Sequence, residues 1–396
     1  MRILLLAPQP FYRDRGTPIA VDLVTRALSE RGDTIDLLTY HIGTDVFHRN
    51  VRVHRIPRVP FVRDVPAGFS FRKALCSLLL SAKALRMARG GRYDVVHAVE
   101  EAVFAAMFIR RRYRVPFVYD MDSSLPQQLV GAYPFLLPLR AWFMRCERWA
   151  VRSAQIVLAV CEPVAVEARR HHQEGIVILP DVVLTTVYAP SSPQRPFLRE
   201  ECGGARGPLV MYVGSLEKNR GIKLLLESFA IASVRVPEAH LVVIGGTPVQ
   251  VETYRRLADR LGLAASVSLL GLRPVSDLGG FLAQADVLVS SQLQEINTPM
   301  KIYSYLASGK AVLATNIAAH RAVVSENSAV LADPNPEAFA AGLTRLLLDP
   351  HLRCRFGDVG LRLVSDRYDY SNFRKTLWAA YDLLGLGSGG ILSNCH

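Results

Sequence analysis

The chain alternates short apolar segments with amphipathic helical segments, and it does so twice. In the first half the clearest predicted strands are 3–7, 34–39, 93–98, 116–120 and 156–161. In the second half they are 209–213, 239–244, 267–270, 285–290 and 311–315. Strands that alternate with helices predict parallel, doubly wound sheets covered by helices.

The position of this repeat predicts two Rossmann-like α/β domains. We expect an N-terminal domain over 1–190, a linker rich in Pro, Ser and Gly over 191–207, and a C-terminal domain over 208–384. The last predicted helix, 371–384, is a candidate to pack back on the N-terminal domain, and the tail 385–396 is expected to be disordered. Ligands bind at the carboxyl ends of parallel strands, so the expected site is a central cleft that both sheets face.

Composition excludes several classes of protein. The six cysteines are scattered and form no C-x-x-C pair, which indicates free thiols in a reducing compartment and argues against a zinc site. The N-terminal apolar run is too short for a signal peptide and reads as a first strand. No uncharged apolar run reaches the length of a membrane span. We therefore expect a cytoplasmic protein without a bound metal.

The net charge of +12 is concentrated in the first half. Residues 1–190 hold 26 Lys and Arg against 17 Asp and Glu, a net of +9, which leaves +3 for the remainder. Such an excess suits a nucleic acid, an anionic membrane surface or an anionic substrate. No nucleic-acid-binding motif is present, so we expect no nucleic-acid partner.

The segment 297–310 reads as a helix beginning beside an anion. Thr298 is a good N-cap, Pro299 suits the first helical position, and Gly309 is a natural stop. Lys301 opposes the helix dipole, and a cation beside free backbone N–H groups indicates a phosphate site. The alternative is that Lys301 only extends into solvent.

Polar residues follow two predicted strands of the first half. His97, Glu100 and Glu101 lie at the end of one strand, and Asp122 lies at the end of the next. Side chains at strand ends bind and react with ligands in this fold class. The alternatives are that the carboxylates cap helices and that His97 is a buried structural residue.

Glycine-containing turns follow the other strands. Backbone N–H groups can approach a ligand at such turns, and Arg220 suits bidentate contact with a phosphate. Glu295 is either an acceptor for sugar hydroxyls or an ordinary loop charge. The turn residues concerned are Gly16, Thr17, Gly214, Ser215, Gly245 and Gly246.

Taken together, these motifs resemble those of the GT-B glycosyltransferases, and within them the retaining nucleotide-sugar transferases of family 4. Asp94-Val95-Val96-His97-Ala98 is similar to the family's D-V-V-H-A-H segment, and Val118-Tyr119-Asp120-Met121-Asp122 is similar to V-Y-D-x-H. Tyr212-Val213-Gly214-Ser215-Leu216, followed by Arg220-Gly221, resembles Y-V-G-R-L-x-x-x-K-G. The segment 299–310 resembles the end of the family's E-x7-E motif.

Several residues depart from this pattern. Ser304 stands where the family has the Glu that holds the nucleotide ribose, and Glu295 is one residue out of register with the first Glu. Ser215 replaces a phosphate-binding Arg, although Arg220 matches the family's Lys. Val99 and Asp122 replace histidines. Either a variant site has formed, or the activity has weakened.

The resemblance implies transfer of a sugar from a nucleotide-diphosphate sugar to a glycan or lipid-linked acceptor, with retention and without a metal or other cofactor. The C-terminal domain would hold the donor, with its diphosphate at Thr298, Lys301 and Arg220 and its base near Leu272. Glu295 and Asn297 are candidates for the sugar hydroxyls. The alternatives are a non-catalytic nucleotide- or sugar-binding protein of the same fold and a GT-B epimerase.

The acceptor side has basic and aromatic residues on one predicted helix, 135–152. Arg140, Trp142, Arg145, Arg148 and Trp149 make this helix a candidate contact with an anionic membrane surface. The alternative is an ordinary packed helix, because Glu147 and the preceding apolar run also suit a core.

Overall fold

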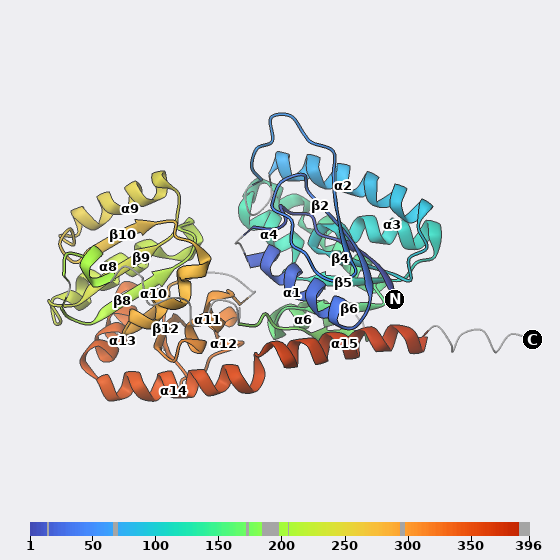
Figure 1. The fold of residues 1–396 in the computed structure, drawn as a ribbon. Coiled ribbons are helices and arrows are strands. Elements are labelled where there is room, and N and C mark those ends of the chain that lie inside the picture. The colour runs from blue at the N-terminus through green and yellow to red at the C-terminus, as the bar shows by residue number, and fades with distance from the viewer. Residues whose placement is uncertain are drawn as a thin grey trace, which may run out of the picture. The chain divides into compact units, whose positions relative to one another are not determined.

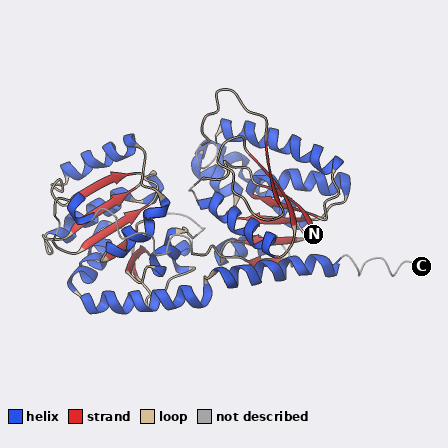
Figure 2. Cartoon of the chain, in the orientation of Figure 1, coloured by secondary structure: helices blue, strands red, loops and turns tan. Residues whose placement is uncertain are grey.

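The computed structural model describes residues 1–13, 16–65, 70–171, 174–183, 198–204, 206–293 and 298–387. The chain divides into two compact units, residues 1–180 with 371–396 and residues 181–370. The final helix therefore groups with the first unit. Figure 1 labels the elements, and Figure 2 shows the strands of each unit lying between helices.

The first unit is built on seven parallel strands in the order β3-β2-β1-β4-β5-β6-β7. The strands are β1 Arg2–Leu6, β2 Thr34–Thr39, β3 Val51–Arg55, β4 Val95–Val99, β5 Phe117–Met121, β6 Ile156–Ala159 and β7 Ile176–Ile178. The α-helices are α1 Gly16–Glu30, α2 Phe71–Gly90, α3 Val103–Tyr113, α4 Leu125–Ala132, α5 Arg140–Ser153, α6 Glu162–Arg169 and α15 Tyr370–Gly387. The described residues of this unit also form the 3₁₀ turns η1 Glu100–Ala102 and η2 Pro134–Leu139.

The second unit has six parallel strands in the order β10-β9-β8-β11-β12-β13. They are β8 Leu209–Val213, β9 His240–Ile244, β10 Val267–Gly271, β11 Val287–Ser290, β12 Ala311–Thr315 and β13 Val330–Ala332. The α-helices are α7 Leu198–Glu201, α8 Ile222–Ser233, α9 Pro248–Arg260, α10 Leu278–Gln284, α11 Lys301–Ala307, α12 Ala318–Arg321, α13 Pro336–Leu348 and α14 Pro350–Arg367. The 3₁₀ turns are η4 Lys218–Arg220 and η5 Val275–Asp277.

The two-domain α/β prediction is confirmed, because both sheets are parallel and their central strands are buried. Ile3 to Leu6 of β1 and Leu209 to Tyr212 of β8 expose no surface. Strands buried on both faces are near-continuous apolar runs, which is why they were readable in the sequence. Strand order reverses beside β1 and β4 in one unit and beside β8 and β11 in the other, and ligands of open α/β sheets bind at such points.

Several predicted boundaries were wrong. The single helix expected over 135–152 is a 3₁₀ turn, η2, followed by α5, because Pro138 cannot donate the backbone hydrogen bond of a continuous helix. The tail expected to be disordered from 385 is helical through Gly387. The expected linker contains the short helix α7, and residues 184–197 lie outside the described part of the chain.

Candidate active site

In the second unit, Lys301 and Tyr212 meet where β8 and β11 diverge. Lys301 begins α11, and its Nζ lies 3.8 Å from the centre of the Tyr212 ring. Gly214 follows β8 with φ +150°, and a Cβ built there would lie only 2.9 Å from Lys301 Nζ. The missing side chain therefore leaves room for the ammonium beside the backbone at the end of β8.

Tyr305 attaches the same short helix to β8. The Tyr305 hydroxyl accepts a hydrogen bond from Val213 N at 2.7 Å and donates one to Val213 O at 3.2 Å. The Tyr212 hydroxyl donates to Ser215 O at 2.8 Å, which shapes the following turn. Two tyrosines thus position both Lys301 and the glycine turn, and neither was singled out from the sequence.

The N-cap role predicted for Thr298 is wrong. Its hydroxyl donates to Ala319 O at 2.8 Å, and its side chain is buried. Helix α11 begins at Lys301, after Met300, so Pro299 precedes the helix instead of occupying its first turn. Tertiary contact with α12 has taken the hydroxyl that the local pattern assigned to the helix. Ser304, on the same helix, is buried at 6 % exposure.

The glycine turns after β8, β9 and β10 lie against one another. Gly245 N donates to Gly271 O at 2.7 Å, and Gly214 N donates to Ile244 O at 3.0 Å. A Cβ on Gly245 would lie 2.0 Å from Gly214 O, and one on Gly246 would lie 2.5 Å from the Leu216 side chain. These glycines are required by close backbone packing. Leu272 follows β10 and is 76 % exposed, as a residue contacting a base would be in the free protein.

Arg220 is a second cation whose charge acts on Tyr212. Its guanidinium donates to Gln292 Oε1 at 2.8 Å, and its carbonyl accepts from Ser291 Oγ at 2.9 Å. Burial raises the pKa of Tyr212 well above 10, and the charge of Arg220 acts in the opposite direction. Arg220 and Lys301 therefore both act on Tyr212.

His320 is a buried neighbour that the sequence analysis missed. Its Nδ1–H donates to Thr315 O at 2.8 Å, and its Nε2 accepts from Ser290 Oγ at 2.9 Å. Burial lowers the pKa of His320 to about 4, and the charge of Lys301 lowers it further. The neutral ring therefore joins the ends of β11 and β12. No local pattern marks it, because the sequence does not show that β11 and β12 lie side by side and bring Ser290 and Thr315 to the same ring.

In the first unit, Glu100 and Glu101 share one buried cation that was also missed. Lys73 of α2 places its Nζ 3.1 Å from a carboxylate oxygen of each. Ser77 Oγ donates to Glu101 Oε1 at 3.1 Å and lies 2.6 Å from the Tyr40 hydroxyl. Burial raises the pKa of Glu101 to about 7, although Lys73 opposes the shift, and both glutamates raise the pKa of Lys73. Glu101 is therefore able to exchange a proton near neutral pH.

The catalytic role considered for His97 is not supported. Its side chain exposes no surface, its Nε2–H donates to Asp120 Oδ2 at 3.2 Å, and its Nδ1 accepts from the Tyr381 hydroxyl at 2.8 Å. Both ring nitrogens are therefore occupied, Nδ1 by α15 and Nε2 by the neighbouring strand β5. The structural alternative fits this geometry better.

The remaining predicted residues occupy loop positions. Asp122 follows β5, is half-buried, and raises the pKa of Tyr119, although burial of that tyrosine is the larger cause. Gly16 and Thr17 open α1 after β1, as expected. Glu295 and Asn297 lie outside the described residues.

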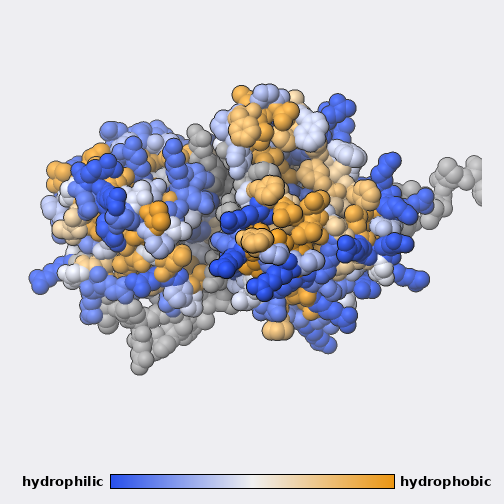
Figure 3. All heavy atoms as spheres, turned by 90° about the horizontal axis from the view of Figure 1, so that it is seen from above, coloured by the Kyte–Doolittle hydropathy of each residue, from blue (hydrophilic) through white to orange (hydrophobic). Residues whose placement is uncertain are grey.

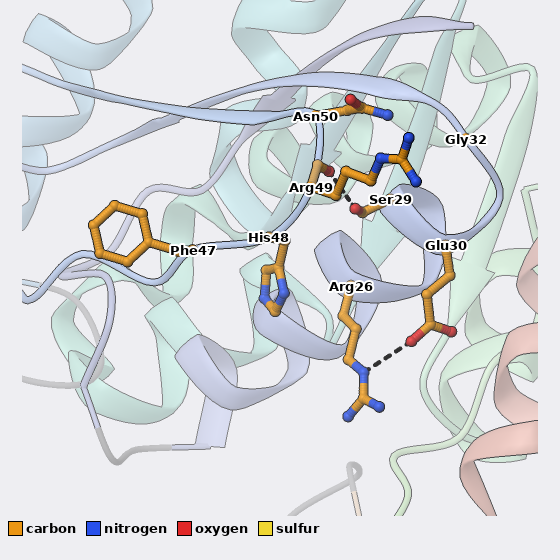
Figure 4. Close-up of a pocket in the computed structure, with 8 residues that line it drawn as sticks. All are labelled: Arg26, Ser29, Glu30, Gly32, Phe47, His48, Arg49 and Asn50. Carbon is orange, nitrogen blue, oxygen red and sulfur yellow. Dashed lines mark hydrogen bonds and ion pairs between the residues drawn. The ribbon is translucent and has the colours of Figure 1, made fainter.

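A surface pocket of about 590 Å³ lies elsewhere in the first unit (Figure 4). Arg26, Ser29 and Glu30 line it from the end of α1, and the segment from Phe47 to Asn50 closes the other side. Arg26 Nε donates to Glu30 Oε1 at 3.0 Å, so these charges are paired with each other. None of the predicted site residues lines this pocket.

Family models match both halves of the chain. Residues 15–180 match a "Glycosyl transferase 4-like domain", and residues 207–349 match "Glycosyl transferases group 1".

None of the helices that the structure describes combines the length and the apolar character needed to span a membrane.

Curated relatives carry glycosyltransferase names. Alpha-D-kanosaminyltransferase of Streptomyces kanamyceticus is 25% identical over 85% of this chain and 91% of its own length. D-inositol 3-phosphate glycosyltransferase of Corynebacterium glutamicum (strain R) is 28% identical, and the match spans 54% of each protein.

Solved structures share the fold over nearly the whole chain. Sucrose-phosphate synthase from Thermosynechococcus elongatus matches with a TM-score of 0.80 and 19% identity, over 98% of this chain and 99% of that one. Anabaena HepE in complex with UDP-glucose matches with a TM-score of 0.74 and 18% identity, over 96% and 99%.

Proposed function

We propose that this chain transfers a sugar from a nucleotide-diphosphate donor to a glycan or lipid-linked acceptor, with retention. The chain is a GT-B glycosyltransferase of the family 4 kind and of the hexosyl type. The observation that carries the donor assignment is the Lys301 ammonium over Tyr212 beside Gly214. The complex of the structural neighbour HepE with UDP-glucose supports the same donor class.

The donor diphosphate is assigned to Lys301, Arg220 and the backbone of the Gly214-Ser215 turn. Two cations stabilise the negative charge that develops on a leaving diphosphate, so this proposal requires no divalent metal. Leu272 would contact the base, Ser304 would take the ribose position of the family's Glu, and Glu295 and Asn297 would contact the sugar.

The acceptor is assigned to carboxylates of the first unit. Asp122 follows β5, and Glu100 and Glu101 follow β4. Burial raises the pKa of Glu101 to about 7, a value that suits a general base near neutral pH. Lys73 would hold the two glutamates and limit the repulsion between them.

A thermal-shift screen of the purified chain against UDP, GDP, ADP, TDP and their sugars tests the donor assignment. A ligand that binds only the native state raises the melting temperature. At a free ligand concentration of a hundred times the dissociation constant, the free energy of unfolding rises by about 2.7 kcal/mol. We expect one base to give a clear shift and its sugar to be hydrolysed slowly without acceptor. A shift without turnover under any acceptor would favour the non-catalytic alternative, and no shift at all would contradict the donor site.

The acceptor is proposed to lie at an anionic membrane, because η2 exposes an aromatic side chain and α5 exposes both aromatic and basic ones. Trp142 and Trp149 are each 61 % exposed, and Phe135 is 75 % exposed. Arg145 and Arg152 are exposed at the same helical spacing. Such a face suits insertion at a lipid interface, with arginines at the headgroups.

The exposed aromatic residues are unevenly distributed between the units. Among the described residues, every phenylalanine and tryptophan with large exposure belongs to the first unit: Phe47, Phe61, Phe71, Phe104, Phe108, Phe135, Trp142 and Trp149. In the space-filling view, hydrophobic residues gather on this unit beside hydrophilic ones (Figure 3).

Sedimentation with vesicles tests the membrane assignment. We expect the chain to bind vesicles containing phosphatidylglycerol more tightly than neutral ones, and the double substitution of Trp142 and Trp149 by Ser to reduce that binding. Leu361→Ser, on the exposed face of α14, is the matched control. Equal binding by both variants would overturn the assignment.

A further inference from the structure

Three metal-binding side chains meet inside the first unit, outside the proposed catalytic residues. Glu147 is 2 % exposed, and Glu167 and His171 are each 6 % exposed. One potential ligand atom from each lies within 4.8 Å of the others. Buried carboxylates are costly unless they are paired, protonated or bound to a cation, so this cluster calls for an explanation.

Two of the three groups lie on helices, and the third lies in the turn that follows one of them. Glu147 comes from α5 and Glu167 from α6, and His171 lies two residues after α6 ends at Arg169. The backbone N–H of His171 donates to Ala168 O at 2.9 Å, so this turn stays attached to the end of the helix. The sequence analysis missed the site because Glu147 joins this pair only through the packing of α5.

Hydrogen bonds orient the carboxylates without using all of their lone pairs. Glu147 Oε1 accepts from Ser124 Oγ and Oε2 accepts from Leu125 N, both at 2.9 Å. Glu167 Oε2 accepts from Arg170 at 2.6 Å. Carboxylate ligands of metals are commonly held by hydrogen bonds of this kind.

The imidazole supplies the observation that points to a ligand. His171 Nε2 lies 3.9 Å from Glu147 Oε1, which is too far for a hydrogen bond. Within the part of the chain that the structure describes, this buried nitrogen has no hydrogen-bond partner. An unsatisfied nitrogen aimed at two carboxylates fits a shared cation.

Three arginines act on this cluster. The charges of Arg148, Arg152 and Arg170 act on His171, and Arg152 Nε donates to His171 O at 3.1 Å. Their repulsion opposes a bound cation, so the three ligands have to outweigh it.

We propose that Glu147, Glu167 and His171 bind one divalent transition metal, with Zn²⁺ as the first choice. Imidazole with carboxylate oxygens is a ligand set that Zn²⁺ accepts, at about 2.0–2.2 Å to each atom. Tetrahedral binding at these distances brings the ligand atoms to roughly 3.5 Å from one another, a modest contraction from the observed arrangement. The metal would join α5 to α6 and stabilise the unit, because all three ligands are buried.

Metal titration of the full chain tests this proposal independently of the donor site. The protein is treated with EDTA, desalted, and titrated with Zn²⁺ by calorimetry and with Co²⁺ by visible absorption. His171→Gln and Glu167→Gln remove one ligand each with little change in volume. Glu162→Gln, an exposed carboxylate on the same helix, is the matched control.

We expect one equivalent of metal per chain, Co²⁺ bands of a tetrahedral site, and a rise in melting temperature with Zn²⁺. His171→Gln and Glu167→Gln should each weaken binding at least about tenfold, and Glu162→Gln should leave it unchanged. The absence of stoichiometric binding, or equal binding by all variants, would overturn the site whatever the result of the nucleotide screen.

Discussion

The ammonium of Lys301 is held 3.8 Å from the centre of the Tyr212 ring, although 89 positions separate the two residues in the chain. A cation over an aromatic face is attracted by the electrons of the ring, by about 0.5–1 kcal/mol when exposed and more when desolvated. Lys301 is therefore oriented before any ligand arrives, which lowers the entropy lost when it contacts a phosphate.

Lys301→Met should weaken binding of the preferred nucleoside diphosphate about tenfold or more, because it removes a charged contact while keeping most of the side-chain length. Arg220→Ala should have a similar effect. Calorimetric titration measures both, and Lys310→Met, at the other end of the same segment, is the control. If neither Lys301→Met nor Arg220→Ala changed the affinity, the phosphate site would be misplaced.

Ser304→Ala should weaken nucleotide binding by about 1 kcal/mol, or roughly fivefold, if the hydroxyl takes the ribose position. Binding of inorganic pyrophosphate should not change, since it has no ribose. Ser308→Ala is the matched control, because that hydroxyl donates to Tyr305 O within the helix. An equal loss for nucleotide and pyrophosphate would indicate a structural role for Ser304.

The hydrogen bond between His97 and Tyr381 should stabilise the docking of α15. In a double-mutant cycle of His97→Leu and Tyr381→Phe, we expect a coupling energy of about 1 kcal/mol, measured by urea unfolding. Tyr381→Phe combined with His240→Asn, in the other unit, should be additive. Additive effects in the first pair would mean that the 2.8 Å contact contributes nothing to stability.

Glu101 should make the folded protein less stable as the pH rises from about 4.5 to 7. Burial raises the pKa of Glu101 in the folded state to about 7, so across this window the folded state binds more protons than the unfolded state. The loss is at most about 1.4 kcal/mol per pH unit for one group. Glu101→Gln removes this dependence of stability on pH, since the amide of glutamine does not titrate.

Urea unfolding of the wild type and Glu101→Gln at pH 5, 6, 7 and 8 measures that difference. The advantage of the wild type over the variant should shrink as the pH rises. Glu162→Gln, at an exposed position, should show no such trend. A difference that stays constant with pH would mean that Glu101 ionises at its ordinary pKa.

The sequence was sufficient for the fold, and it supplied the residues on which the donor-site proposal rests. Buried strands such as β1 and β8 are apolar on both faces, so local composition reveals them. The chain order of strands and helices then leaves few topologies besides two parallel sheets. Gly214, Arg220 and Lys301 were found because turns and charges at strand ends have local signatures.

Only the tertiary structure decided which groups are partners. Thr298 leaves its predicted cap for Ala319 O, His97 uses both ring nitrogens inside the first unit, and Lys73 comes from α2 to join Glu100 and Glu101. Each contact joins residues that lie too far apart in the sequence for local propensity to predict it. Buried hydrogen bonds and ion pairs depend on packing that brings such residues together and excludes water, so the sequence pattern determined the elements and tertiary packing determined the chemistry of their side chains.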